Sequence, residues 1–188
     1  MSVRVVAHDP GWKGKFEAEA DQISGALGDI VVTLHHIGST ALPEVLAKSV
    51  IDVLLEVDDI VRLDDKSSAM EQLGYEVIGD GIPGRRYFRR DHASGIRTHQ
   101  VHVFQKDGPQ IKCHLAFRDY LIAHSAEART YGELKRRLAR EHPDDMEAYM
   151  DGKAPFIKEH KAKTLAWWSS QRAKVFHQPD RSVALSND

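Results

Sequence analysis

Residues 49–57 are the segment that most constrains the fold of this chain, because they read SVIDVLLEV and are apolar from Val50 onward apart from Asp52 and Glu56. Such a continuous run of valine, isoleucine and leucine predicts a central strand that is covered on both faces. Side chains alternate along a strand, so Asp52, Leu54 and Glu56 share one face. An ionised carboxylate inside such a strand is costly unless a metal or a cation balances it. Asp52 is therefore the first candidate functional residue, and pairing with an interior Arg or His is the structural alternative.

The elements around this strand predict an α+β layout. Strands are expected over residues 30–37, 49–57, 75–78, 85–90 and 98–105. Helices are expected over residues 10–27, 43–47 and 60–73. A long helix is expected from residue 111 to Pro143, with a break near Ser125. Another is expected from residue 146 onward, with a kink or a break at Pro155. This order predicts a mixed sheet with helices on one side, followed by C-terminal helices. We expect one domain over residues 1–175, with a sheet part to about 110, a helical part over about 111–175, and a flexible tail over 176–188.

Composition narrows the classes of function. The chain has 188 residues, with 26 Lys and Arg against 28 Asp and Glu, and the formal net charge of −2 argues against a dedicated binder of duplex DNA. The single cysteine, Cys113, excludes an internal disulfide framework and a Cys-rich zinc site. No apolar run reaches the roughly 18 residues that cross a bilayer, and the first residues lack a secretory signal. We expect a cytoplasmic protein without a membrane partner.

A small-residue turn, Gly38-Ser39-Thr40, precedes the central strand. Backbone N–H groups and hydroxyls at such a turn favour a phosphate group, and Lys48 adds a positive charge nearby. The alternative for the tripeptide alone is a simple Ser/Thr helix cap. Carboxylates on one strand face hold Mg²⁺ beside phosphates. Asp52 and Glu56 are thus predicted ligands of Mg²⁺ or Mn²⁺, although the strand pattern favours a place in water at the strand end for Glu56.

Several short motifs, in order along the chain, resemble the GrpB family. They are DPGW at 9–12, HIGSTALP at 36–43, AKSVID at 47–52, YFR at 87–89, HQVHV at 99–103, HLAFRDYL at 114–121, YGELK at 131–135 and YMDGK at 149–153. Together they extend over about residues 8–168. This family is similar to the nucleotidyltransferase superfamily, whose hallmark is a Gly-Ser turn followed by two carboxylates, two residues apart, on the next strand. The resemblance implies a nucleotidyltransferase-like fold.

Carried over residue by residue, the resemblance implies that Gly38 and Ser39 form the phosphate-binding turn and that Asp52 is the first metal carboxylate. The second carboxylate should occupy position 54, which is Leu54 here. A two-metal mechanism needs oxygen ligands that bridge ions about 3.5–4 Å apart, and leucine has none. Glu56 lies on the same face but two residues further along the strand.

Histidines supply further candidates for this site. His99 and His102 are three residues apart, so they point to opposite faces of a regular strand. His102 is the one expected to face Asp52, where the superfamily often places a third carboxylate, and it is a third predicted metal ligand. His36 and His114 could join it. Imidazole with a carboxylate suits a transition metal or an acid–base pair. The alternative is that these histidines bond the backbone and stabilise the sheet.

The basic run RRYFRR at residues 85–90 is the best anion-binding candidate outside the turn. Alternation divides it into two sets of side chains, and one set could clamp phosphates bidentately. On this basis we place Arg86 in the predicted phosphate-binding pocket, beside the Gly38 turn and Asp52. The alternative is a solvated edge strand that is guarded by charge. The second basic run, residues 135–137, is expected on the solvated surface.

These features favour a domain that binds a nucleotide or another phosphorylated small molecule together with a divalent ion. If the domain is catalytic, it would transfer a nucleotidyl or phosphoryl group. Asp52 and His102 would be catalytic, and an arginine would balance the developing charge. The alternative is a non-catalytic ligand-binding or regulatory module on the same fold, which Leu54 favours. A third reading is a hydrolytic metal site built from Asp52 with His99 or His102.

Overall fold

A five-stranded mixed sheet forms the centre of the computed structural model, which describes residues 3–43, 45–79 and 81–176. The strands are β1 (Val31–Ile37), β2 (Ile51–Val57), β3 (Glu76–Gly79), β4 (Arg85–Asp91) and β5 (Arg97–Gln105), and the α-helices are α1 (Gly11–Leu27), α2 (Ile60–Asp65), α3 (Ser67–Gln72), α4 (Pro109–Ala123), α5 (Ser125–Glu141) and α6 (Met146–Phe176). The spatial order is β1-β2-β5-β4-β3, and only β2 and β5 run parallel. This is the expected α+β architecture, a mixed sheet with helices.

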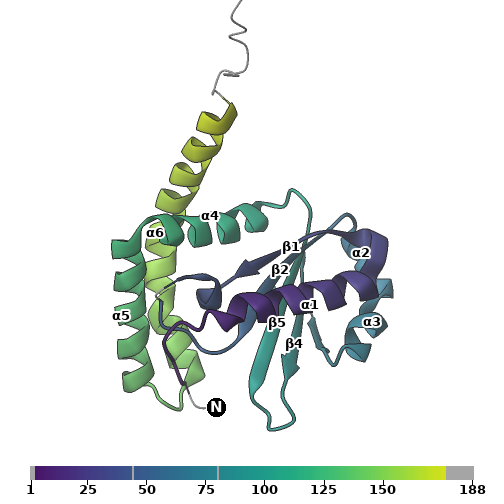
Figure 1. Ribbon diagram of the computed structural model, residues 1–188, viewed down its shortest axis with the longest axis horizontal. Helices are drawn as coiled ribbons and strands as arrows, with labels where there is room; N and C mark the ends of the chain where they lie inside the picture. Colours follow the sequence, from purple (N-terminus) through teal and green to yellow (C-terminus); the bar gives the residue numbers. More distant parts are fainter. Residues whose placement is uncertain (1–2, 44, 80, 177–188) are drawn as a thin grey trace, which may run out of the picture.

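One face of the sheet is covered by α1, α2 and α3 (Figure 1). The three- and four-residue spacing of apolar residues in α1 places Trp12, Ile23 and Leu27 on its buried side. They pack on the side chains of β2 that point the same way, among them Val53 and Leu55, which are fully buried. Burial of this surface orients the strand, so the alternate residues Asp52 and Leu54 face the opposite side of the sheet.

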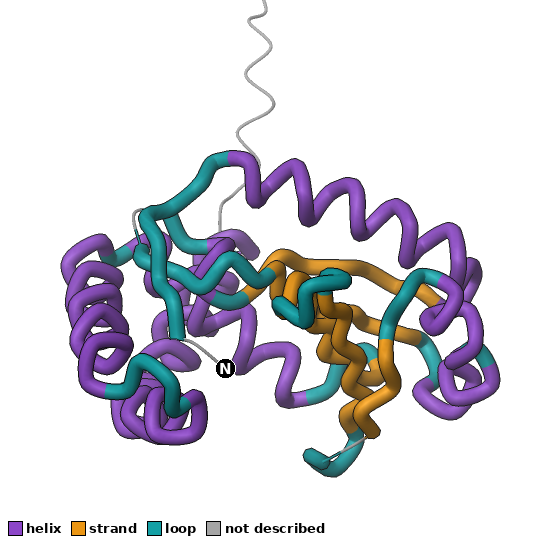
Figure 2. The backbone as a smooth tube through the Cα atoms, turned by 90° about the horizontal axis from the view of Figure 1, so that it is seen from below, coloured by secondary structure: helices purple, strands orange, loops and turns teal. Residues whose placement is uncertain are grey.

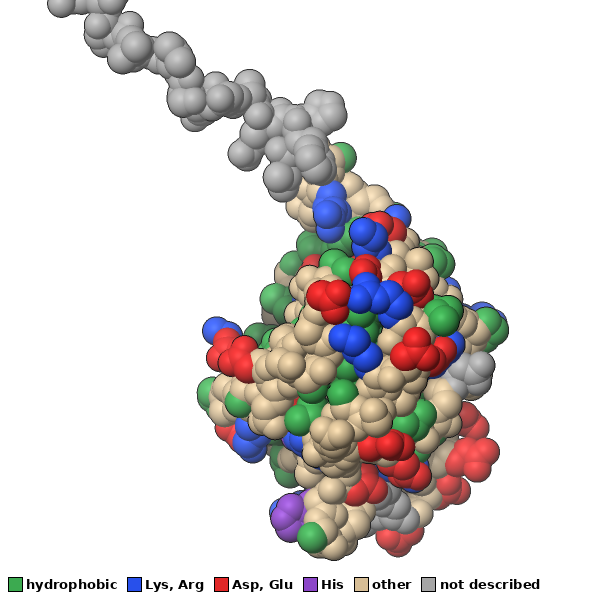
Figure 3. Space-filling view, turned by 90° about the vertical axis from the view of Figure 1, so that its right-hand side faces the viewer, with side chains coloured by type: hydrophobic (Ala, Val, Ile, Leu, Met, Phe, Trp, Pro, Cys, Tyr) green, Lys and Arg blue, Asp and Glu red, His purple; other side chains and the backbone are tan. Residues whose placement is uncertain are grey.

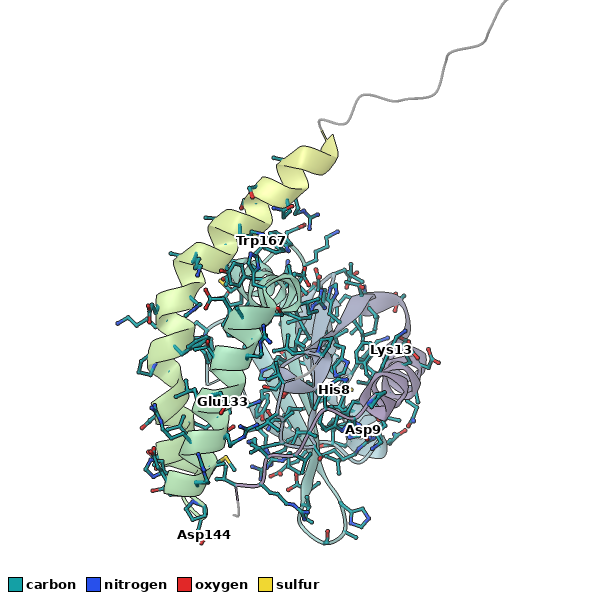
Figure 4. The ribbon with its side chains drawn as sticks, turned by 60° about the vertical axis from the view of Figure 1, so that its left-hand side comes forward. His8, Asp9, Lys13, Glu133, Asp144 and Trp167 are labelled. Carbon is teal, nitrogen blue, oxygen red and sulfur yellow. The ribbon has the colours of Figure 1, made fainter. Side chains whose placement is uncertain are left out.

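The opposite side of the sheet is approached by the C-terminal helices. Figure 2 shows the strands between helices, and a second apolar cluster joins Leu54 of β2 to Ile111 and Leu115 of α4. Trp167 of α6 points toward α4 (Figure 4), where its ring meets that of Tyr120 edge-on with centroids 5.6 Å apart. These contacts hold the helical part against the end of the sheet that carries Asp52.

The N-terminal segment ties the two parts together. Val6 forms a β-bridge with Ala47 beside the central strand, and the Val3 amide donates to the Pro143 carbonyl at 2.7 Å. Val3 is also buried against Leu138 of α5 and Tyr149 of α6. The sheet part and the helical part are thus joined by chain contacts as well as by apolar packing.

Two predictions about helices need correction. The helix expected over residues 60–73 divides into α2 and α3 at Lys66, whose side chain donates to the Leu27 carbonyl at 2.6 Å. The helix expected over residues 43–47 does not form among the described residues there, and a 3₁₀ turn over Ser39–Ala41 replaces it. The last helix continues through Pro155, which excludes a break there, while the alternative prediction of a kink stays a prediction. The predicted flexible tail lies almost entirely outside the described residues.

Charges intermingle on the side of the molecule that carries α2 and α3, as Figure 3 shows. Arg62 bridges Asp29 at 2.7 Å and Asp58 at 3.0 Å, and such exposed pairs contribute little to stability. Among the described residues, no helix combines the length and the apolar character that a membrane span requires.

Candidate functional site

A cavity of about 470 Å³ lies between the sheet and the three C-terminal helices. Its walls come from the turn after β1, from β2, β5, α4, α5 and α6. The lining residues that carry polar or charged groups include Ser39, Lys48, Asp52, Gln100, His102, His114, Arg118, Tyr131, Lys135, Tyr149, Lys153, Lys161 and Thr164. The volume is in the usual range of small-molecule sites.

The floor of the cavity is formed where the Gly38 turn meets Asp52. Ile37, the last residue of β1, pairs with Asp52 of β2, so the chain turns directly over the carboxyl group. Gly38 has φ +68° and ψ −168°, a conformation that is essentially restricted to glycine. A Cβ atom at this position would lie 2.8 Å from the Cβ and Cγ atoms of Asp52. The glycine therefore permits the close approach of turn and carboxylate.

Asp52 is surrounded by lysines rather than by other carboxylates. Burial raises the pKa of Asp52 to about 6, and the charges of Lys48, Lys153 and Lys135 act in the opposite direction. Lys48 belongs to the loop before β2, Lys135 to α5 and Lys153 to α6. Three separate parts of the fold thus direct a cation toward one carboxylate.

Two of these lysines are unusually buried for charged side chains. Lys135 is only 2% exposed and Lys153 only 9%. Burial lowers the pKa of Lys135 to about 7 and that of Lys153 to about 8, and the neighbouring lysine charges reinforce both shifts. The Lys135 ammonium donates to the Leu46 carbonyl, and the Lys48 ammonium lies 3.3 Å from the Met146 sulfur. Desolvated positive charge of this kind favours an anionic ligand.

Two tyrosines support the lysines. Lys153 Nζ lies 4.7 Å and Lys48 Nζ 5.7 Å from the centroid of the Tyr149 ring, while Lys135 Nζ lies 5.4 Å from that of Tyr131. The Tyr149 hydroxyl is buried and finds no hydrogen-bond partner among the described residues. A buried orphan hydroxyl is costly, so it indicates a partner beyond the described residues.

Five of the predicted site residues line this one cavity: Gly38, Ser39, Lys48, Asp52 and His102. The turn, the central strand and β5 converge there because β2 pairs with β1 on one side and with β5 on the other. Their joint position agrees with the proposed phosphate-binding role without testing it.

Three predicted site residues lie elsewhere, each with a partner of its own. The Thr40 hydroxyl donates to the Val50 carbonyl at 3.1 Å. Glu56 contacts His35 at 2.7 Å, beyond buried Leu54, and does not line the cavity. Arg86 makes a bidentate contact with Asp64 at 2.6 and 2.7 Å. The placement of Arg86 in the pocket was therefore wrong, because its face of β4 is the one that packs toward α1–α3.

The histidines divide as alternation predicted. His102 faces the cavity and contacts the rings of Tyr87 and His114 at 5.0 and 5.8 Å between centroids. Burial lowers the pKa of His102 to about 3, which keeps the imidazole neutral at physiological pH. His99 lies on the opposite face, where it contacts Glu19 at 3.5 Å, so it cannot join Asp52. His36 is stacked on Phe16 of α1, away from the cavity.

Lys135 and Lys153 were missed as site residues, and Lys135 was expected on the solvated surface. A local signal was present, because YGELK and YMDGK both place a tyrosine four residues before a lysine. Residues four apart share one face of a helix. The repeated spacing therefore marks two helix faces of the same chemical character, and in the fold both face the cavity.

The buried lysines give stability a predictable pH dependence. The pKa of Lys135 is lowered to about 7 in the folded chain, so above that pH the folded state binds fewer protons than the unfolded state and stability rises with pH. We expect a gain of about 2 kcal/mol between pH 7 and pH 9. Lys135→Met should reduce this gain, whereas Lys158→Met, at an exposed position of α6, should leave it unchanged. Urea unfolding at both pH values measures it, and an identical gain in the Lys135 variant would contradict the assignment.

Comparison with known proteins shows which family this chain belongs to. The chain matches the family model described as GrpB protein over residues 2–163. It is 37% identical over 166 residues to the UPF0157 protein YqkA of Bacillus subtilis, a match that covers 88% of this chain and 48% of that protein. The chain thus spans about half the length of this curated relative.

Two solved structures share the fold. The conserved protein GrpB from Enterococcus faecalis aligns with a TM-score of 0.83 and 41% identity, covering 88% of this chain and 99% of that one. The Cid1 poly(U) polymerase with MgGTP bound aligns with a TM-score of 0.51 and 15% identity, covering 72% of this chain and 44% of that one. The second likeness concerns the fold alone. The chain belongs to the GrpB family.

Proposed function

We propose that the cavity binds a phosphorylated small molecule, with a nucleotide as the first candidate. The observation that carries this proposal is the convergence of Lys48, Lys135 and Lys153 on a cavity with the single carboxylate of Asp52. Three cations against one anion leave an uncompensated positive charge in a partly desolvated site. A phosphate group supplies both the negative charge and several hydrogen-bond acceptors.

The rest of the cavity suits the organic part of such a ligand. Phe117 of α4 and His114 offer flat ring surfaces, and Ile157 adds apolar area from α6. Ser39, whose side chain is hydrogen-bonded to Tyr131, lines the same cavity beside Asp52. The fold likeness to a polymerase solved with MgGTP bound supports a nucleotide as the first class to test.

Nucleotidyl or phosphoryl transfer is the second candidate function. It is favoured by the position of Asp52 against the Gly38 turn, where a carboxylate could accept the proton of an attacking hydroxyl. Leu54 favours the non-catalytic alternative, because it is fully buried where the superfamily has its second carboxylate. Nucleotidyl transfer would release pyrophosphate from a nucleoside triphosphate, and phosphoryl transfer would release the nucleoside diphosphate. Measurement of both products with a panel of hydroxyl acceptors separates the enzyme from the binding module.

Thermal shift tests the binding proposal directly. A nucleotide at about 100 times its dissociation constant stabilises the folded state by about 2.7 kcal/mol, which raises Tm by about 5–10 °C for a chain of this size. The matched control is the same nucleoside without phosphate, which should give a much smaller shift. Equal shifts with and without phosphate, or no shift with any phosphorylated compound, would contradict the proposal.

A further inference from the structure

The position that should supply a second metal carboxylate is closed to a metal ion. Leu54 is 0% exposed and packs with Ile37, Phe104 and Leu115 between the sheet and α4. Glu56, the next residue on that face, is held by His35 at 2.7 Å. The face of β2 that carries Asp52 therefore offers one carboxylate to the cavity, and a pair of bridged ions needs more than that.

The neighbouring strand β5 does not supply the missing second carboxylate. In the parallel pairing of β2 and β5, Asp52 lies opposite Gln100 and Leu54 opposite His102. Neither residue brings a negative charge, and His102 is in ring contact with Tyr87 and His114. Among the described residues, no group of three or more His, Cys, Asp or Glu side chains is arranged to hold a metal ion. The residues present do not fit the divalent-ion site of the superfamily.

Cations from the protein occupy the surroundings of Asp52 instead. Lys48 and Lys153 both lie against the ring of Tyr149, at 5.7 and 4.7 Å from its centroid, and Lys135 approaches from α5. A divalent cation placed beside Asp52 would meet three like charges. A phosphate group in the same place would meet three counter-charges.

We propose that Lys48, Lys135 and Lys153 take the place of the divalent ion, so that this cavity binds the phosphate group of its ligand without a metal. This inference rests on the proposed function and specifies its chemistry. When all three lysines are protonated, they and the ionised Asp52 leave an excess of two positive charges, which matches the charge of a phosphate monoester. The ligand class is thus a metal-free phosphate ester, such as a nucleotide, rather than a magnesium complex.

Asp52 has a different role in this arrangement from that of a metal ligand. It is the counter-charge that allows three ammonium groups to remain near one another before the ligand binds. Once phosphate neutralises the lysines, the carboxylate can accept a hydrogen bond from a hydroxyl or amine of the ligand. A ligand with both a phosphate and such a donor would use every polar group at the cavity floor.

Isothermal titration tests this inference with nucleoside mono- and triphosphates, each in excess EDTA and in excess MgCl₂. We expect binding in EDTA, with an affinity at least equal to that in MgCl₂, because Mg²⁺ competes with the lysines for the phosphate oxygens. Binding that occurs only with Mg²⁺, or becomes at least tenfold tighter with it, would overturn the inference and leave the proposed function intact. Failure to bind under both conditions would overturn the proposed function itself.

Matched variants test whether binding in EDTA depends on the lysine cluster, which consists of Lys48, Lys135 and Lys153. Lys153→Met retains the aliphatic stem on Tyr149 and should weaken binding in EDTA at least tenfold, while Lys158→Met, exposed on the same helix, should change it less than twofold. Lys48→Met, from the loop before β2, repeats the test at a second site, and circular dichroism establishes that each variant is folded. Equal binding by the wild type and by both cluster variants would overturn the inference.

Discussion

Gly38→Ala is expected to destabilise the protein by about 4 kcal/mol and to weaken nucleotide binding at least tenfold. The backbone at Gly38 has φ +68° and ψ −168°, which costs a residue with a side chain about 1–3 kcal/mol. The new methyl group would overlap the Asp52 carboxyl group, and overpacking of this kind adds about 1–3 kcal/mol. Because both residues form the floor of the cavity, relief of the overlap must move the turn or the carboxylate.

Gly25→Ala is the matched control for this substitution. Gly25 lies on the exposed side of α1, and a Cβ atom there would meet nothing within 4 Å. Alanine is the better helix former, so this variant should be as stable as the wild type or more stable by up to about 1 kcal/mol. Urea unfolding and titration with a nucleotide measure both variants. A Gly38→Ala protein that matches the wild type in both measurements would show that the turn does not contact Asp52 as described.

Glu19→Gln is expected to cost about 3 kcal/mol of stability without changing ligand affinity. Glu19 is 3% exposed in α1, where it is paired with Arg90 of β4 and accepts from the Tyr75 hydroxyl at 2.9 Å. His99 of β5 lies 3.5 Å from the same carboxylate. Removal of one charge from a buried pair leaves the other uncompensated, which typically costs 3–5 kcal/mol. The glutamine amide can keep part of the hydrogen bonding, so we expect the lower end of that range.

The matched control for Glu19→Gln is a substitution two residues earlier in α1. Glu17→Gln removes an exposed carboxylate that is 3.5 Å from Lys13, and its effect should stay within about 0.5 kcal/mol. Because the Glu19 network occupies the face of the sheet opposite the cavity, titration should give wild-type affinity for both variants. Similar destabilisation by the two substitutions would contradict a special role for the buried network.

The fold was largely predictable because its signals are local. The apolar run around β2 and the helical spacing in α1 are patterns that depend on a few neighbouring residues. The division of residues 60–73 at Lys66 was harder to predict from the sequence, because the Lys66 side chain donates to the carbonyl of Leu27, the last residue of α1. The continuation of α6 through Pro155 likewise depends on packing against α4 and α5 rather than on local propensity.

The site was predictable only in part. Strand alternation correctly separated His99 from His102, yet it gives two faces without saying which one meets the cavity. Arg86 was therefore assigned to the wrong side of β4, where Phe88 is buried in the α1 core. Lys135 looked like part of a solvated basic run, because burial of a lysine depends on tertiary neighbours that no local pattern records.

A crystal structure of the protein with its tightest-binding nucleotide, grown in EDTA, tests the central claim most directly. The account predicts a phosphate group in the cavity, with its oxygens about 2.7–3.2 Å from at least two of the ammonium nitrogens of Lys48, Lys135 and Lys153. The Tyr149 hydroxyl should gain a partner in the same complex. A phosphate bound outside this cavity, with the three lysines in contact with the protein alone, would contradict the account.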